Sequence, residues 1–200
     1  MTDLFEEKSK NWDANQRRLQ MSLGIGGCIL ENVELNEAMH VMDFGAGTGL
    51  IAAQIAPHVK KVTAVDVSMS MLEKLISKIE LKDKVDIVCK DITTHPLDTQ
   101  FDLIVSAMAM HHVQDTSNLV QRFAEHLKPG GAVALADLDA EDGGFHNPPS
   151  EGVFHKGFDR GELKSIFENN GFSNVRFVNA YTAIRENGDY PIFLVLATKK

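Results

Sequence analysis

Three glycines after a short apolar segment form the clearest chemical feature of this chain. Residues 41–44 are mostly apolar, and Gly45, Gly47 and Gly49 follow at alternate positions. Where such a loop joins a strand to a helix, a ligand can approach bare backbone amides at the helix N-terminus. The spacing excludes two ligand classes. A dinucleotide fingerprint needs a glycine where Leu50 stands, and no Gly-Lys-Ser/Thr follows for a phosphate-binding loop.

Two acidic residues stand at the ends of neighbouring predicted strands. Asp43 precedes the glycine loop, and a carboxylate there disfavours a phosphate-rich ligand. Asp66 ends the next predicted strand, 21 residues after Gly45 (66 − 45). Nucleoside-binding α/β folds place at this position an acid that accepts hydrogen bonds from the ribose hydroxyls. The pair therefore indicates a nucleoside-containing ligand.

Histidines supply the candidate proton acceptors. His111 and His112 follow the fourth predicted strand, where they should line the cleft beside the bound ligand. Adjacent residues point apart, so joint metal ligation by these two is disfavoured. His155 is an alternative base. It belongs to a loop that we interpret either as a packed lid or as a ligand-binding wall, with Phe145, His146, Phe154, His155 and Phe158.

A regular alternation of elements must position these residues. From residue 39 on, short apolar segments alternate with amphipathic stretches, which is the pattern of βαβ units around a parallel sheet. The predicted strands are 39–44, 61–65, 85–89, 101–106, 132–136, 174–180 and 192–198. Residues 181–190 are too few for a crossover helix, so the last pair should be antiparallel. We predict a Rossmann-like, doubly wound α/β fold whose mostly parallel seven-stranded sheet ends in an antiparallel C-terminal hairpin.

Helices are predicted between the strands. Apolar stripes mark helices over 69–79 and 119–127. A third helix has a capping box at Asp159 and a left-handed stop at Gly171. Residues 1–35 also have a helical pattern, which we expect the glycines at 24, 26 and 27 to interrupt.

Composition excludes several functional classes. Twenty Lys and Arg against 28 Asp and Glu give a net charge of −8, which disfavours nucleic acid as a partner. No apolar run reaches the ~18 to 20 residues of a membrane helix, and the acidic start predicts a cytoplasmic protein rather than a secreted one. Cys28 and Cys89 form no CxxC pair, so neither a disulfide framework nor a structural zinc site is expected.

Residues 43–49 read DxGxGxG and resemble motif I of class I methyltransferases that use S-adenosylmethionine. Further elements follow in the matching order: Asp66, the segment 89–92, the strand 101–106, and Leu-Lys-Pro-Gly-Gly at 127–131. The resemblance extends well over residues 39–137. It implies S-adenosylmethionine as the cofactor, whose ammonium and sulfonium suit the charge of Asp43.

The same resemblance implies a set of cofactor contacts and no metal. Asp91 would hold the adenine amino group, and the Ile92 amide would meet a ring nitrogen. The expected cofactor-binding residues are Asp43, Gly45, Ala46, Gly47, Gly49, Asp66, Val67, Met71, Asp91, Ile92 and Ser106.

The sequence fits the individual methyltransferase subfamilies less well than it fits the family as a whole. Quinone-biosynthesis O-methyltransferases are similar after the fourth strand but carry Glu-x-x-Glu-His there, where Met108 and His111 occupy the Glu places. Residues 147–150 resemble the NPPY motif of amino-methyltransferases but follow the fifth strand, so we interpret them as a turn. Asp137 and Asp139 share one face of the fifth strand, near where catechol-type enzymes hold magnesium. No matching acid follows the fourth strand. Two cysteines are too few for arsenic methylation.

We therefore predict a methyltransferase that acts on a small-molecule acceptor by in-line displacement. The chain is expected to be a single domain. Its parts are a helical arm or lid (1–38), a cofactor-binding core (39–137), a loop or lid (138–158), and a C-terminal helix with a hairpin (159–200). The net charge predicts a neutral or cationic acceptor. Two alternatives stay open: a non-catalytic cofactor-binding partner subunit and a nicotinamide-dependent dehydrogenase, which Leu50 disfavours. Oxygen, nitrogen, sulfur and carbon all remain candidates for the methylated atom.

Overall fold

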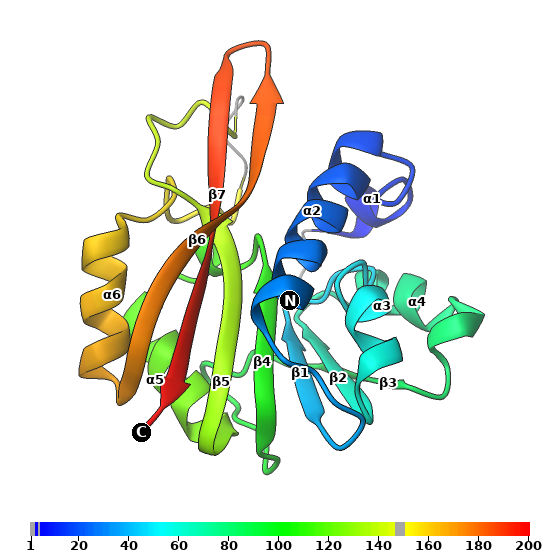
Figure 1. The fold of residues 1–200 in the computed structure, drawn as a ribbon. Helices are drawn as coiled ribbons and strands as arrows, with labels where there is room; N and C mark the ends of the chain where they lie inside the picture. Colours follow the sequence, from blue (N-terminus) through cyan, green and yellow to red (C-terminus); the bar gives the residue numbers. More distant parts are fainter. Residues whose placement is uncertain (1–2, 4, 147–150) are drawn as a thin grey trace.

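Seven strands form one mixed sheet through the middle of the molecule (Figure 1). The computed structural model describes residues 3, 5–146 and 151–200. The strand order is β3-β2-β1-β4-β5-β7-β6. The strands are β1 (His40–Phe44), β2 (Lys61–Asp66), β3 (Val85–Cys89), β4 (Phe101–Ala107), β5 (Leu127–Leu138), β6 (Phe172–Arg185) and β7 (Gly188–Lys199). Strands β1 to β5 are parallel, and β7 is antiparallel to both β5 and β6. The predicted fold class is confirmed.

Helices cover both faces of this sheet. They are α1 (Glu6–Ser9), α2 (Gln16–Asn32), α3 (Ala52–Ile55), α4 (Met69–Ile76), α5 (Thr116–His126) and α6 (Arg160–Asn169), with short 3-10 helices η1 (Ala56–His58), η2 (Ile79–Leu81) and η3 (Met110–His112). One buried core lies under α2, α3 and α4, and a second lies under α5 and α6. Figure 1 shows these two groups on opposite sides of the sheet. In the described part of the chain, no helix combines the length and apolarity needed to cross a bilayer.

Local chemistry explains where the helices begin and end. Ser68 Oγ accepts from the Met71 amide at the start of α4, and Asp115 does the same for α5. Asp159 Oδ1 accepts from two amides at the start of α6. Gly171, with φ +87°, follows α6 as its left-handed stop. These side chains satisfy amides that have no partner inside the helix.

Two expectations about element boundaries are wrong. Helix α2 runs through its three glycines without interruption, and close packing explains two of them. A Cβ on Gly24 would lie 2.6 Å from the Tyr181 ring, and one on Gly26 would lie 2.2 Å from Gln54 Oε1. The hairpin strands are also longer than predicted, since β6 continues to Arg185 and most of the expected connection is strand.

The sheet register brings the carboxyl ends of β1, β2 and β4 together. Phe44 pairs with Val65 on one side and with Ser106 on the other. In open parallel sheets, ligands bind at this edge, outside the strand ends. The glycine loop, Asp66 and the segment after β4 therefore all meet at one end of the sheet.

Candidate functional site

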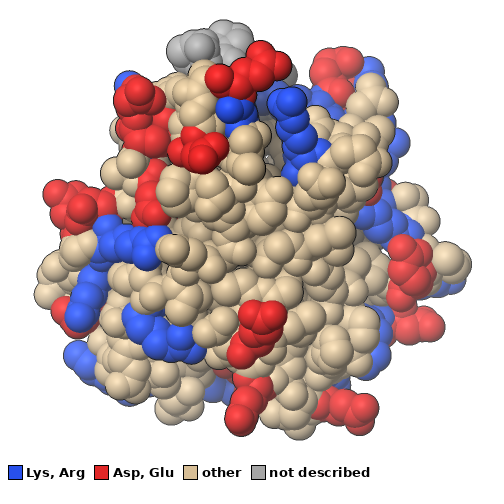
Figure 2. Space-filling model, turned by 45° about the horizontal axis from the view of Figure 1, so that its top comes forward, with Lys and Arg blue, Asp and Glu red and all other residues tan. Residues whose placement is uncertain are grey.

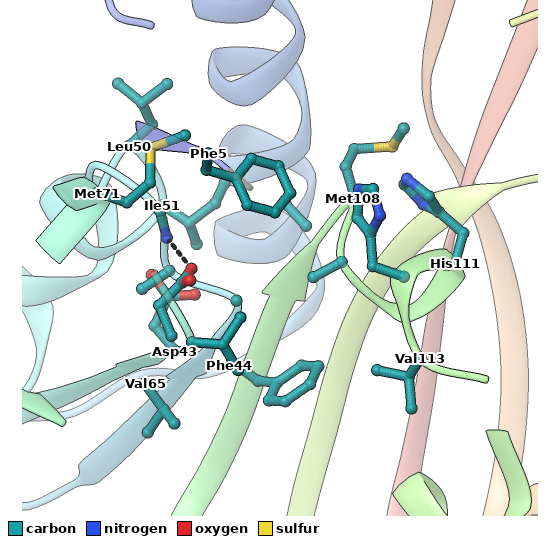
Figure 3. Close-up of a pocket in the computed structure, with 18 of the residues that line it drawn as sticks. Phe5, Asp43, Phe44, Leu50, Ile51, Val65, Met71, Met108, His111 and Val113 are labelled. Atoms are coloured by element: carbon teal, nitrogen blue, oxygen red, sulfur yellow. Dashed lines mark hydrogen bonds between the residues drawn. The ribbon is translucent and has the colours of Figure 1, made fainter. Parts of the chain in front are cut away.

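A cavity of about 850 Å³ opens at the carboxyl ends of the parallel strands. Its walls come from the β1–α3 loop, the ends of β2 and β3, the segment after β4, and the N-terminal helices. Phe145, His146, Phe154 and Arg185 complete the lining. Figure 3 shows Asp43 and Met71 on one side of this space and Met108 and His111 on the other, with the Phe5 ring between them. A volume of this size is typical of small-molecule sites.

The glycine loop forms one end of the cavity. Gly45, Gly47 and Gly49 have φ values of +66°, +54° and +82°, which glycine adopts readily. A Cβ on Gly45 would lie 2.3 Å from the Ala109 Cβ, so this turn packs directly on the segment after β4. At Gly47 a Cβ would meet nothing within 4 Å. The backbone at Gly47 is therefore open to a ligand.

Asp43 is a buried carboxylate with an unsatisfied oxygen. Its residue is 1% exposed, and Oδ2 has no hydrogen-bond partner among the described residues. Burial raises the pKa of Asp43 to about 8, and the charge of Asp66 adds to the rise, while the Ala52 amide opposes it. A cationic ligand group in the cavity would favour the ionised form. This orphaned oxygen fits a ligand that carries an ammonium or a sulfonium.

Asp66 presents a second carboxylate to the cavity. Its Oδ2 accepts from the Gly47 amide at 2.8 Å, and its Oδ1 accepts from the Ser68 amide at 2.9 Å. Burial raises the pKa of Asp66, although these amide hydrogen bonds counteract it. A carboxylate oxygen can accept more than one hydrogen bond. Asp66 can therefore hold the loop and receive ligand hydroxyls together.

The structure brings most of the predicted cofactor residues to the cavity. Eight of them line it: Asp43, Gly45, Ala46, Gly47, Asp66, Val67, Met71 and Asp91. Gly49, Ile92 and Ser106 are not among the lining residues. A Cβ on Gly49 would meet the Leu75 side chain at 2.7 Å. Ile92 is buried in the core under α5, and Ser106 Oγ donates to the Phe44 carbonyl.

A buried, hydrogen-bonded histidine–aspartate pair lies at the other end of the cavity. His111 Nδ1 donates to Asp137 Oδ1 at 2.7 Å, and the His111 amide donates to Asp137 Oδ2 at 3.2 Å. Both residues are at most 1% exposed. Burial lowers the pKa of His111, but the charge and hydrogen bond of Asp137 outweigh it, so the pKa is raised. The carboxylate fixes the proton on Nδ1 and leaves the Nε2 lone pair for a ligand.

Two further histidines crowd this ring. The ring centroids of His111 and His112 are 4.2 Å apart, and those of His111 and His146 are 5.1 Å apart. His112 Nδ1 donates to the Gly152 carbonyl at 2.7 Å. Burial first, and then the charge of His111, lowers the pKa of His112 to about 4 and that of His146 to about 4. Both rings are therefore neutral at pH 7.

The remaining predicted candidates lie elsewhere. His155 is not a lining residue, and its Nε2 contacts the carbonyls of Val113 and Gln114. Asp139 forms a two-point ion pair with Arg160, so it does not share a site with Asp137. Within residues 3, 5–146 and 151–200, no group of His, Cys, Asp and Glu is arranged to hold a metal ion. The proposed turn at 147–150 lies outside the described residues.

The N-terminal arm closes over the cofactor end. Thr48 Oγ1 donates to Asp13 Oδ1, and Lys78 Nζ lies 2.7 Å from Asp13 Oδ2. Trp12, next to Asp13, lines the cavity, and its ring lies near the edge of Phe5 at a centroid distance of 6.2 Å. The arm thus adds apolar walls to a cavity whose floor is polar.

Sequence reasoning missed two features of this site, the pairing of Asp137 with His111 and the position of Arg185, whereas His146 was included in the possible ligand-binding wall. A parallel β4–β5 pair places Asp137 beside the segment after β4, so this signal was available. The length of the hairpin, which decides where Arg185 lies, had no comparable signal.

Comparisons with known proteins agree with this geometry. A family model described as "Methyltransferase domain" matches residues 41–131. An uncharacterized methyltransferase of Schizosaccharomyces pombe is 28% identical over 166 residues, which is 74% of this chain and 58% of that protein. A ubiquinone biosynthesis O-methyltransferase of Coxiella burnetii is 31% identical over 102 residues, or 50% of this chain and 44% of that protein. The chain thus covers less than two thirds of either relative.

Solved structures share the fold. The N-methyltransferase NodS of Bradyrhizobium japonicum, in complex with S-adenosyl-L-homocysteine, aligns with a TM-score of 0.71 at 17% identity, covering 94% of this chain and 89% of that one. A chain in the complex of the Haloferax volcanii Trm112 methyltransferase activator aligns with a TM-score of 0.84 at 14% identity, covering 100% and 99%. The chain therefore has the fold of these methyltransferase structures, and its residues 41–131 match a methyltransferase domain. The curated relatives named above are methyltransferases as well.

Proposed function

We propose that this protein methylates a small-molecule acceptor at an oxygen or nitrogen that must lose a proton, with His111 as the general base. One observation carries the proposal. The buried His111–Asp137 pair opens on the same cavity as the carboxylates of Asp43 and Asp66. Donor and acceptor sites therefore belong to one space of about 850 Å³.

Asp43, Asp66 and the open backbone at Gly47 would hold S-adenosylmethionine at the glycine-loop end. When bound, this group supplies a methyl carbon on a sulfonium, and the electron pair of the broken C–S bond stays with sulfur. Asp43 balances positive charge, and Asp66 accepts hydroxyl hydrogen bonds. The walls at Phe5, Trp12 and Met108 exclude water from the space between the two ends.

His111 acts at the opposite end. Its Nδ1–H is held by Asp137, so Nε2 can accept the proton that the acceptor oxygen or nitrogen loses as its bond to carbon forms. The resulting imidazolium is stabilised by the adjacent carboxylate. His112 and His146, with pKa values lowered to about 4, stay neutral and are weaker bases. The similarity to a ubiquinone biosynthesis O-methyltransferase over half of the chain supports an oxygen acceptor.

The test is an acceptor screen that detects S-adenosylhomocysteine formed from S-adenosylmethionine. We expect turnover with a phenol or an amine, and loss of about 10²- to 10⁴-fold in kcat for His111→Gln, the usual contribution of a general base. His58→Gln, which changes an exposed histidine on η1, is the matched control. Unchanged turnover in His111→Gln would exclude His111 as the general base. Tight cofactor binding without turnover on any acceptor would favour the non-catalytic subunit instead.

A further inference from the structure

Charged side chains of both signs line the cavity. Acidic side chains come from the ends of the first three strands: Asp43, Asp66 and Asp91. Four basic residues also line it: Lys8 on α1, Arg18 on α2, Lys90 after β3 and Arg185 on β6. In Figure 2, Lys and Arg side chains flank a hollow near the top of the molecule. Basic side chains therefore line this cavity although the whole chain is acidic, and Arg185 is the one next to Phe145 and His146.

Arg185 is held in a fixed position at this end. Its guanidinium carbon lies 3.8 Å from the centroid of the Phe145 ring, and Nη1 donates to the Phe145 carbonyl at 2.6 Å. A guanidinium has five N–H donors in one plane, and this carbonyl uses one of them. Stacking on an aromatic ring orients the group at little further entropic cost. The remaining donors are therefore preorganised.

No acidic side chain neutralises Arg185 in the described part of the chain. None of the ion pairs there includes Arg185 or Arg18. Glu141 lies near enough to act on Arg185, but its Oε2 accepts from the amides of Gly143 and Phe145, and it does not line the cavity. Burial lowers the pKa of Arg185 most, and the charges of Arg17 and Arg18 lower it further, while Tyr190 and Glu141 oppose the fall. An anion would relieve this repulsion.

His146 adds a second polar group at the same place. It follows Phe145 in sequence, its ring lies 4.9 Å from the Phe145 ring, and its buried Nε2 has no partner among the described residues. A neutral imidazole can donate an N–H to an anion. Arg185 and His146 thus both present uncommitted polar atoms to the space beside His111.

We propose that Arg185, stacked on Phe145 and assisted by His146, binds an anionic group of the acceptor, a carboxylate or a phosphate. The acceptor class is then a small molecule that carries this anion and a nucleophilic oxygen or nitrogen within reach of His111. That the molecule bound by Arg185 is the methyl acceptor rests on the methyl transfer proposed above. It replaces the neutral or cationic acceptor expected from net charge, because the field inside a cleft is set by the groups that line it.

Arg18 has a different place in the same cavity. Its guanidinium lies 4.1 Å from the centroid of the Trp12 ring, and the next residue, Asp13, is bound to Thr48 of the glycine loop. Arg18 is therefore linked through the arm to the cofactor end, where it would meet the carboxylate of a bound cofactor, although its charge also reaches Arg185. We assign the acceptor anion to Arg185 alone, and the experiment separates the two arginines.

Calorimetry with four probes that share one ring tests the assignment: benzoate, phenyl phosphate, benzamide and benzylammonium. Each is titrated into the protein with and without saturating S-adenosylhomocysteine. We expect at least one anion to bind ten or more times more tightly than benzamide, and this preference to disappear in Arg185→Gln, which keeps a polar side chain without the charge. Arg176→Gln, on the same strand but bound to Asn32 outside the cavity, is the control.

The outcomes distinguish the two proposals. Binding of S-adenosylhomocysteine to the wild-type protein and to Arg185→Gln with equal affinity reports an intact cofactor site, whereas Arg18→Gln should weaken it. The acceptor assignment is overturned if neither anion is preferred over benzamide, including the case in which no probe binds, or if the preference survives in Arg185→Gln. A wild-type protein that does not bind S-adenosylhomocysteine would contradict the proposed function. In that case the titrations without cofactor would still show whether Arg185 binds an anion.

Discussion

His111 Nδ1 and Asp137 Oδ1 lie 2.7 Å apart, in side chains that the fold removes almost completely from solvent. His111 belongs to η3, just after β4, and Asp137 belongs to the neighbouring strand β5. The parallel pairing of these strands, with Ala107 opposite Ala136, sets the distance. The register of the sheet therefore brings together two side chains that lie 26 residues apart in the sequence.

The first prediction concerns the proton affinity of this ring. Burial lowers the pKa of His111 and Asp137 raises it, so Asp137→Asn should leave burial dominant and move the pKa below its ordinary value. NMR titration of the His111 ring protons measures the change, with assignment from His111→Gln. In a turnover assay, wild-type activity should rise with pH as the raised pKa is passed, and the rise should move to lower pH in Asp137→Asn. An unchanged His111 pKa would contradict the pairing.

The second prediction concerns protons released when the cofactor binds. With a pKa of about 8, Asp43 is mostly protonated at pH 7 in the empty protein, and a cationic ligand favours its ionised form. Binding should then release up to one proton at pH 7, and affinity should rise with pH until about 8. Calorimetry in phosphate and in Tris, whose ionisation enthalpies differ, counts these protons. Asp43→Asn should bind more weakly and show no such release; equal release in that variant would assign the proton elsewhere.

Local sequence signals predicted the cofactor end better than the acceptor end. Gly45 and Asp66 follow strands at fixed offsets, so a single βα unit determines their positions. The prediction that α2 is interrupted was wrong, because Gly24 makes room for the ring of Tyr181, a residue of β6. Arg185 depends on the length of the hairpin and on Phe145, which lies 40 residues earlier. Contacts between distant segments have no local pattern from which they could be predicted.

The same limit applies to the predicted cofactor residues that do not line the cavity, although the prediction for Ile92 concerned its backbone amide and stays a prediction. The side chains of Ile92 and Ser106 point into the protein. Ile92 is fully buried in the core, and Ser106 Oγ donates to the Phe44 carbonyl of the adjacent strand at 2.7 Å. Motif spacing determines which residues end a strand, whereas side-chain direction depends on neighbouring strands and helices. Ser106 thus supports the site by tying β4 to β1.

The third prediction concerns Asp66. We expect Asp66→Ala to weaken S-adenosylhomocysteine binding at least tenfold, or about 1.4 kcal/mol, because a charge-assisted hydrogen-bonding group is lost. The Gly47 amide also loses its 2.8 Å partner, so the loop itself is loosened. Calorimetry gives the affinity. Asp86→Ala, which removes an exposed carboxylate on β3 that pairs with Lys61, should leave it unchanged. Equal affinities for the two variants would exclude Asp66 from the site.

The fourth prediction separates backbone strain from steric overlap at the glycine loop. Gly45 and Gly130 both have positive φ values, +66° and +74°, so alanine at either position costs about 1–2 kcal/mol of unfolding free energy. At Gly130 a Cβ would meet nothing within 4 Å, whereas at Gly45 it would lie 2.3 Å from the Ala109 Cβ. Overlap of this kind costs about 1–3 kcal/mol more.

Gly45→Ala should therefore be the less stable variant in urea unfolding, with the denaturant slope unchanged. Its overlap pushes on Ala109, which follows Met108 with its φ of +59° and leads into His111. The shift should reach the acceptor end, so Gly45→Ala should also weaken S-adenosylhomocysteine binding and alter the His111 titration. Gly130→Ala, in the irregular part of β5 between the paired residues Leu127 and Ala132, should keep both properties. If the two variants lose equal stability and keep the same His111 pKa, the glycine loop and the segment after β4 are not in contact.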